Sequence, residues 1–222
     1  MAPSWACRWK ICCNKEVPAV YRNAEYYPDP TAGAAFNNIR EGRMNNTGKQ
    51  FEEDFAASIP PGTHCYRLRD SPSSFGQDSA SVRFTPDNIA DFEVYRYPNH
   101  FYFELKHTEQ PSIPLDKIMG RYLPDKGRCK RQKQLDRMLA ADAIRGQFAR
   151  YVICYARTGH TYALPPHALL RFLQQGGRRS IPESFCRQEG LEMPRRKLRV
   201  HYRYDVAGLM DALGQSDEKM EE

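Results

Sequence analysis

One stretch of this sequence, residues 89–106, limits the fold more than any other. Two aromatic runs flank the turn sequence Pro98-Asn99-His100, a pattern that predicts a β-hairpin. Side chains alternate between the two faces of a strand. After the turn, the apolar face holds Phe101, Phe103 and Leu105, and the opposite face holds Tyr102, Glu104 and Lys106. The hairpin therefore predicts a sheet with a core on one side and charged groups on the other.

The same hairpin brings Asp91 back toward Glu104 and Lys106. Two carboxylates beside a lysine suit a metal-dependent phosphodiester hydrolase. The carboxylates bind a hard divalent cation, and the lysine orients the attacking water or helps to deprotonate it. The alternative is an ordinary surface hairpin with a solvated ion pair. The spacing alone leaves both interpretations open.

The positive charge of the chain is unevenly placed. The 222 residues are enough for one domain with a sizeable core, and the formal net charge is +6. Between Lys117 and Arg150 there are ten Lys or Arg against three Asp, and between Ala168 and Tyr204 nine against three Glu. This concentration predicts a polyanionic partner, with ordinary solubilising charge as the alternative.

Cysteine usage and hydropathy indicate the compartment. The seven cysteines show no paired spacing typical of zinc sites. No apolar run approaches the length of a membrane span, and the first residues lack the apolar region of a signal peptide. These features predict a protein of the reducing cytoplasm.

The chain divides into three predicted parts. Residues 1–43 mix Pro, Gly, Ala, Asn and Cys without periodicity and predict a flexible N-terminal extension. Residues 44–214 form the predicted folded domain, and residues 215–222 form a short acidic tail. Within the domain, residues 70–88 are rich in Ser, Pro, Asp and Gly and predict a long excursion between two strands.

Periodicity predicts helices over about 48–57, 127–145, 166–175 and 205–213, and strands over 64–69, 89–95, 101–106, 148–156, 161–164 and 198–204. Thr47 and Asp205 are suitable N-caps, and Gly176-Gly177 a suitable helix end. This order predicts an α/β fold with a mixed central sheet flanked by helices.

Several of these segments resemble known nucleases. The first predicted helix, the Asp91 … Glu104-Leu105-Lys106 hairpin and the helix after it resemble the restriction-endonuclease-like core of the PD-(D/E)xK superfamily. Residues 113–118, 134–138 and 176–182, the last reading Gly-Gly-Arg-Arg-Ser-Ile-Pro, resemble the RecU family of Holliday junction resolvases in order and approximate spacing. The resemblance covers roughly residues 44–205.

The chain also departs from that family. RecU-type proteins carry a stalk between the first two core strands, and residues 70–88 here are shorter with a Ser/Gly-rich sequence of their own. Arg137 stands where the family often has histidine, and residues 1–43 have no counterpart. These departures suggest a divergent or phage-type relative, and they affect the expected junction selectivity more than the chemistry.

The resemblance implies a Mg²⁺-dependent endodeoxyribonuclease, with Mn²⁺ able to substitute. Asp91, Glu104 and Glu52 would bind the metal, with Glu53 as the alternative to Glu52. Lys106 would activate the water. Gln134 would position that water or touch DNA, unless it is a plain surface glutamine.

The implied substrate is branched DNA in the form of a four-way junction, cut during recombination or repair in a bacterial or phage-infected cytoplasm. Because a four-way junction is two-fold symmetric, a homodimer is implied. Arginine suits phosphate geometry, and glycine lets backbone amides approach closely. The predicted DNA contacts are Arg67, Lys130, Arg131, Lys133, Arg178 and Arg179.

Two other functions stay open. One keeps the fold and changes the substrate, giving a restriction-like or repair nuclease that cuts duplex or flapped DNA. The other is a DNA-binding recombination factor with vestigial nuclease activity. Preference for a junction over a duplex distinguishes a resolvase from the first alternative. Cleavage in Mg²⁺ distinguishes a nuclease from the second.

Overall fold

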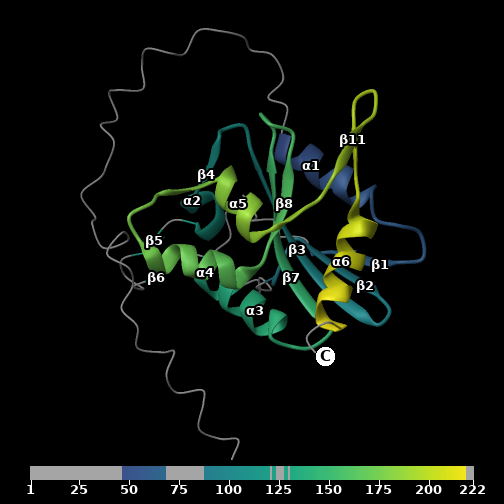
Figure 1. Ribbon diagram of the computed structural model, residues 1–222, viewed down its shortest axis with the longest axis horizontal. Helices are drawn as coiled ribbons and strands as arrows, with labels where there is room; N and C mark the ends of the chain where they lie inside the picture. The colour runs from purple at the N-terminus through teal and green to yellow at the C-terminus, as the bar shows by residue number, and fades with distance from the viewer. Residues whose placement is uncertain (1–46, 69–87, 121, 124–127, 130, 219–222) are drawn as a thin grey trace, which may run out of the picture.

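The computed structural model describes residues 47–68, 88–120, 122–123, 128–129 and 131–218. The predicted N-terminal extension and nearly all of the Ser/Gly-rich excursion lie outside these residues. The described residues form one central sheet with helices on both sides (Figure 1). The predicted α/β fold with a mixed sheet between helices is therefore confirmed.

The central sheet has six strands in the spatial order β1-β2-β3-β7-β8-β10. Its strands are β1 (His64–Arg67), β2 (Phe92–Arg96), β3 (Asn99–Thr108), β7 (Gln147–Tyr155), β8 (Thr161–Leu164) and β10 (Leu191–Glu192). All neighbours are antiparallel except β3 and β7, which run parallel with Glu104 opposite Tyr151. The parallel pair occupies the middle of the sheet, so β3 is covered on both edges and both faces.

Three smaller strand pairs lie outside the central sheet. They are β4 (Ser112–Pro114) with β9 (Ser180–Pro182), β5 (Tyr122–Leu123) with β6 (Arg128–Cys129), and β11 (Arg195–Lys197) with β12 (Tyr202–Tyr204). Each pair is antiparallel. The β4–β9 pair joins two segments that are far apart in the sequence.

Helices cover the two faces of the sheet in separate groups. One face carries α1 (Thr47–Ala56) and α6 (Val206–Glu218). The other carries α2 (Leu115–Met119), α3 (Gln132–Asp142), α4 (Pro166–Gln175) and α5 (Glu183–Glu189). Figure 1 shows the second group on the left of the sheet and the first on the right.

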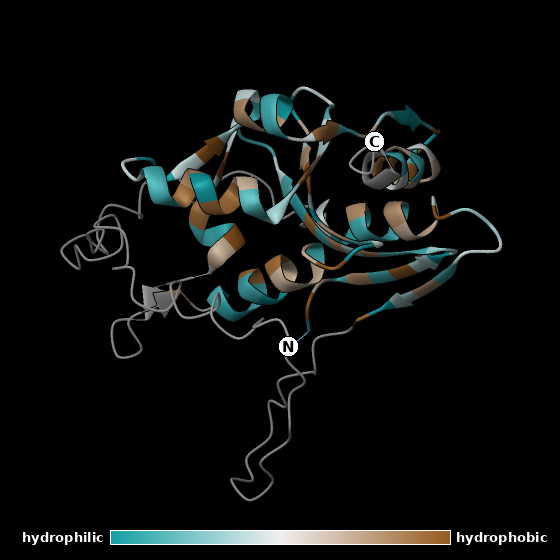
Figure 2. Ribbon diagram, turned by 60° about the horizontal axis from the view of Figure 1, so that its bottom comes forward, coloured by the Kyte–Doolittle hydropathy of each residue, from teal (hydrophilic) through white to brown (hydrophobic). Residues whose placement is uncertain are grey.

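Each face has its own apolar core. Phe51 and Phe55 of α1 pack with Phe92 and Phe103 of the predicted hairpin, as the alternation of that strand indicates. Figure 2 shows the brown, apolar stretches of the helices and strands interrupted by teal, polar ones. Because Phe103 packs against α1, the alternate residues of β3, such as Glu104, face α3 on the other side of the sheet.

Several element boundaries differ from the sequence-based prediction. The helix expected over 127–145 is shorter, because Arg128 and Cys129 pair as strand β6 before α3 begins at Gln132. The single strand expected over 198–204 is wrong, since β11 and β12 form a hairpin with residues 198–201 as its turn. Asp205 does cap α6, accepting a hydrogen bond from the Gly208 amide at 2.9 Å. Of the helices in the described ranges, none is long and apolar enough to cross a membrane.

Candidate active site on strand β3

The β2–β3 hairpin fixes Asp91 beside Glu104. Phe92 lies opposite Phe103 in the ladder, and the Asp91 amide donates to the Phe103 carbonyl oxygen at 3.1 Å. The Asp91 carboxylate in turn accepts a hydrogen bond from the Leu105 amide, with Oδ2 2.7 Å from the nitrogen. A main-chain donor thus holds this side chain in one orientation, so the two acidic residues are placed by the sheet itself.

Lys106 and Gln134 complete the cluster. The Lys106 ammonium pairs with Glu104 Oε1 and also donates to the Leu105 carbonyl oxygen at 3.2 Å. Gln134, from α3, donates from Nε2 to Glu104 Oε2 at 2.8 Å. Both oxygens of Glu104 therefore have fixed partners, and Gln134 is not a plain surface glutamine.

Glu104 carries a negative charge in an unfavourable place. The residue is only 2% exposed. Burial raises its pKa to about 6, although the adjacent Lys106 acts in the opposite direction; the Asp91 charge adds to the rise, and Arg131 opposes it. A buried carboxylate beside a second, half-buried one favours either a shared proton or a bound cation.

The donor atoms suit a hard divalent ion. Mg²⁺ is commonly bound by one or two carboxylates, with waters and substrate phosphates as the other ligands. Asp91 and Glu104 supply the carboxylates, and the Leu105 carbonyl belongs to the residue directly after Glu104. Within the described ranges, no three His, Cys, Asp or Glu residues are grouped so as to hold a metal. The set fits an ion that depends on substrate oxygens, rather than a closed structural site.

Glu52 lies on α1, next to strand β1. Its carboxylate pairs with the Arg67 guanidinium, which sits over the Phe92 ring at 5.9 Å from its centroid. Phe92 belongs to the core on the α1 face, whereas Glu104 bonds to α3 on the other face. Arg67 lies opposite Phe92, the residue after Asp91, so the Glu52–Arg67 pair is held near the start of β2. The neighbouring Glu53 pairs with Lys49 at 3.9 Å. A metal role for Glu52 stays a prediction, as does a DNA contact for Arg67.

The Gly-Gly-Arg-Arg loop, residues 176–179, is brought to the end of β3 by the small β4–β9 sheet. Gly176 and Gly177 have positive φ values of 66° and 75°, which glycine adopts without strain. The Arg179 carbonyl accepts a hydrogen bond from the Leu115 amide at 2.9 Å, at the start of α2. Both arginine side chains are exposed. The two segments singled out in the sequence, 113–118 and 176–182, are thus neighbours in space.

The other predicted DNA contacts have mixed positions. Arg131 anchors the start of α3, with its NH1 donating to the Lys117 carbonyl at 2.9 Å. Its charge also reaches Glu104. Lys133 is exposed on α3. Lys130 lies outside the described residues. Arg131 is therefore both a link between α2 and α3 and part of the electrostatic environment of the site.

One residue of the site had no signal in the sequence. Tyr151 of β7 lies beside Glu104 in the parallel ladder and is buried. Burial and the Glu104 charge both raise its pKa, so its hydroxyl stays neutral. Parallel pairing depends on tertiary contacts across a long connection, which is why no local pattern reveals this neighbour.

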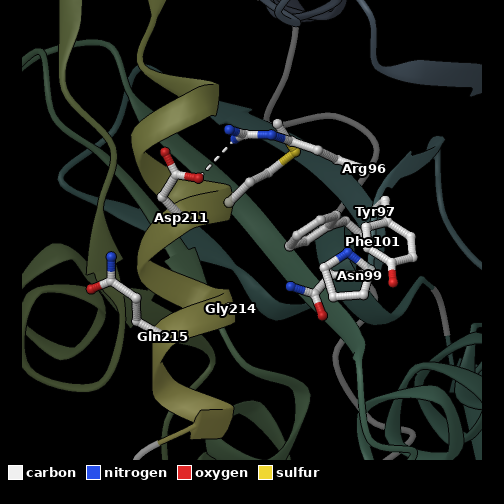
Figure 3. A pocket seen from close by; sticks show the side chains of 9 residues that line it. Arg96, Tyr97, Asn99, Phe101, Asp211, Gly214 and Gln215 are labelled. Atoms are coloured by element: carbon white, nitrogen blue, oxygen red, sulfur yellow. Dashed lines mark ion pairs between the residues drawn. The ribbon is translucent and has the colours of Figure 1, made fainter.

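The cavity shown in Figure 3 is separate from this site. It has a volume of about 210 Å³ and lies at the turn end of β2 and β3, against α6. An ion pair between Arg96 and Asp211, 2.8 Å long, borders it, and the exposed Tyr97 stands at its edge. None of Asp91, Glu104 and Lys106 lines this cavity.

Comparisons with known proteins add no identification. Neither models of protein families nor the curated proteins give a match to this chain.

Proposed function

We propose that this protein is a Mg²⁺-dependent endodeoxyribonuclease that cuts branched DNA. The observation that carries the proposal is the convergence of Asp91, Glu104, Lys106 and Gln134, which come from the residue before β2, from β3 and from α3. Residues 30 positions apart meet at a buried carboxylate. An exposed ion pair on an ordinary hairpin would not require a buried carboxylate with a hydrogen-bond partner on a distant helix.

The residues have distinct parts in the proposed hydrolysis. Asp91 and Glu104 would hold the ion, and Gln134 would keep Glu104 in its orientation. Lys106 would orient the attacking water, since its ammonium is held between Glu104 and the Leu105 carbonyl. When bound, Mg²⁺ supplies positive charge against the phosphate oxygens and lowers the pKa of a bound water.

In the reaction, a water oxygen bonds to phosphorus as the bond to the 3′-oxygen breaks. The attacking water releases a proton to solvent, and the leaving oxygen takes one from a solvent water. The products are a 3′-hydroxyl and a 5′-phosphate, as the resemblance to PD-(D/E)xK nucleases implies. Stabilisation of the charge that develops on the phosphate is usually a large part of such catalysis. Lys106 is positioned to contribute to it.

The choice of substrate rests on the sequence motifs rather than on the site. The Gly-Gly-Arg-Arg-Ser-Ile-Pro segment and its partner at 113–118 resemble RecU-type resolvases, and they are neighbours at the end of β3. We therefore propose the four-way junction as substrate and a homodimer as the active form. The two-fold symmetry of the junction requires a cut in each of two opposed strands.

Cleavage of labelled DNA tests this function. The purified full chain would be incubated with Mg²⁺ and either a four-way junction or a duplex of equal arm length, and each reaction would be repeated with a chelator. We expect nicks in the junction, dependence on Mg²⁺, and weaker cutting of the duplex. Equal cutting of both substrates would favour a duplex or repair nuclease. Binding without any cutting would favour a recombination factor with vestigial activity.

A further inference from the structure

The β11–β12 hairpin, residues 195–204, is a basic element that the proposed active site does not use. It contains Arg195, Arg196, Lys197, Arg199, His201 and Arg203 and no acidic residue. The hairpin pairs only with itself and extends beyond α1 and the central sheet (Figure 1). Its outer residues are exposed, Val200 at its turn by 65%. The concentration of positive charge on this exposed hairpin therefore requires a physical explanation.

Two of its arginines face each other across the ladder. Arg196 lies directly opposite Arg203. Like charges at directly opposed positions destabilise an antiparallel pair. In the described part of the chain, no carboxylate pairs with either arginine, or with Lys197 or Arg199. Among the described residues nothing offsets this repulsion, and an anionic partner would remove it.

Arg195 shows what a structural arginine looks like in the same strand. Its guanidinium lies over the Tyr202 ring, 4.2 Å from the centroid, and donates from NH1 to Cys154 Sγ at 3.5 Å. It fixes the hairpin to β7. Within the described ranges Arg196 and Arg203 have no comparable anchorage: Arg203 donates to the neighbouring Tyr202 carbonyl at 3.4 Å.

The hairpin is held rigidly at its other side by α1. Asp54, only 2% exposed, accepts from the Tyr202 amide at 2.9 Å and bonds to His201 Nδ1 at 2.7 Å. Ser58 Oγ accepts from the Tyr204 amide at 3.0 Å, and Gln50 donates to the Val200 carbonyl at 3.1 Å. These bonds fix the backbone of the hairpin before any partner arrives, which lowers the ordering entropy lost on binding.

The base of the hairpin lies at the end of β3 that carries Lys106. Its Arg195 donates to Cys154, which is opposite His107 in the parallel ladder. Lys117 of α2, whose carbonyl accepts a hydrogen bond from Arg131, also acts electrostatically on His107. Arg195 acts on His107 in the same way. Positive groups from both faces of the sheet thus approach the residue that follows Lys106.

We propose that the β11–β12 hairpin is a second DNA-binding element, whose Arg196 and Arg203 contact the phosphates of the duplex arm beside the cut. This inference rests on the proposed function for its substrate. A two-stranded ribbon is narrow enough to enter the major groove, which is about 12 Å wide in B-DNA. Arginine contacts to phosphate explain why two opposed guanidinium groups are tolerated.

The test compares two double variants of the full chain. Arg196→Gln with Arg203→Gln removes two charges from the hairpin. The matched control, Arg96→Gln with Arg171→Gln, removes two charges that already pair with Asp211 and Glu189. Binding to labelled duplex and four-way junction would be measured in chelator over a range of salt concentrations. Thermal unfolding of the free proteins would be followed in parallel.

We expect the hairpin variant to bind both DNAs more weakly. Its slope of log affinity against log salt should be shallower by about 1.8, because each lost phosphate contact is worth roughly 0.9. Its unfolding temperature should be unchanged or higher, since a like-charge pair is removed. The control should keep the wild-type slope. An unchanged slope in the hairpin variant, or a slope change equal to that of the control, would overturn the proposal.

The two proposals fail separately in this design. If the wild type binds DNA through the hairpin but never cuts it in Mg²⁺, the nuclease function is wrong and the hairpin inference stands. If the wild type cuts DNA and the hairpin variant binds as the control does, only the hairpin inference is wrong. A wild type that binds neither DNA would reject both.

Discussion

Gln134 Nε2 lies 2.8 Å from Glu104 Oε2, and this hydrogen bond connects helix α3 to the acidic residue on strand β3. The other oxygen of Glu104 pairs with Lys106. A buried carboxylate with one amide and one ammonium partner has little freedom to turn. Its orientation is therefore set by the packing of α3 on the sheet, and the site depends on contacts distant in sequence.

Removing the Gln134 amide should slow cleavage and leave DNA binding in place. Mutation of a residue that orients a metal ligand typically lowers activity or metal affinity by about 10- to 100-fold. We expect Gln134→Ala to reduce the single-turnover rate by about that factor. Gln132→Ala is the control, since Gln132 lies on the same helix and bonds to Asp136 instead. Equal rates for the two variants would show that the Glu104 contact has no part in catalysis.

Glu104 should make the stability of the metal-free protein depend on pH. Its pKa rises from an ordinary 4.5 to about 6 in the folded state. Between these values the folded state binds more protons than the unfolded state, so stability falls as pH rises through this range. A shift of this size corresponds to about 2 kcal/mol.

Urea unfolding in chelator, below pH 4.5 and above pH 6, measures this effect. Glu104→Gln has no titrating group at this position, so its stability lacks this pH dependence. The wild type should gain unfolding free energy relative to the variant at the lower pH, and any stability advantage of the variant should shrink or reverse. Metal affinity should also weaken as pH falls below 6, because the proton competes with the cation. Parallel pH curves for the two proteins would contradict the assigned environment of Glu104.

Lys106 should affect the chemical step more than binding. We expect Lys106→Ala to slow single-turnover cleavage by roughly two or more orders of magnitude, the usual range for a lost acid–base or electrostatic group. Affinity for junction DNA in chelator should change little. If the variant binds DNA poorly but cuts at the normal rate once saturated, Lys106 is a phosphate contact.

The sequence was sufficient for the parts of this site that depend on local pattern. Alternation along residues 101–106 predicted which face of β3 is polar, and the turn at Pro98 predicted that Asp91 returns to Glu104. Both follow from a period of two and a short connection. The pairing of Asp91 with a main-chain amide then follows from the register of the hairpin.

The remaining features depend on long-range packing. Glu52 was predicted as a ligand from helix α1, and in the structure it pairs with Arg67 of strand β1, a long-range contact that no local pattern indicates. Its metal role stays a prediction. Tyr151 is a neighbour of Glu104 through a parallel ladder. The strand predicted over 198–204 combines the turn of the β11–β12 hairpin with β12, because the turn residues 198–201 continue the alternating pattern. A single sequence gives no sign of which strands become neighbours or where an alternating run reverses direction.

The Gly-Gly-Arg-Arg loop should contribute to DNA affinity independently of the metal. If Arg178 and Arg179 each neutralise a phosphate, replacing both with Gln should make the salt slope shallower by about 1.8. The loss should be the same in chelator and in Mg²⁺, because it concerns binding. The Arg96→Gln, Arg171→Gln protein again serves as the charge-matched control. A wild-type slope would indicate that the two arginines have no phosphate contact.

The central claim is that Asp91 and Glu104 form a metal-dependent hydrolytic centre. The most direct measurement compares the wild type with Asp91→Asn and with Glu104→Gln on one labelled four-way junction in Mg²⁺, with binding and cleavage recorded in the same samples. Each variant removes an anionic ligand at almost constant volume, while the phosphate contacts that carry most of the affinity stay intact. We expect both variants to bind the junction as the wild type does and to leave it uncut. Cleavage by either variant at the wild-type rate would contradict the assignment.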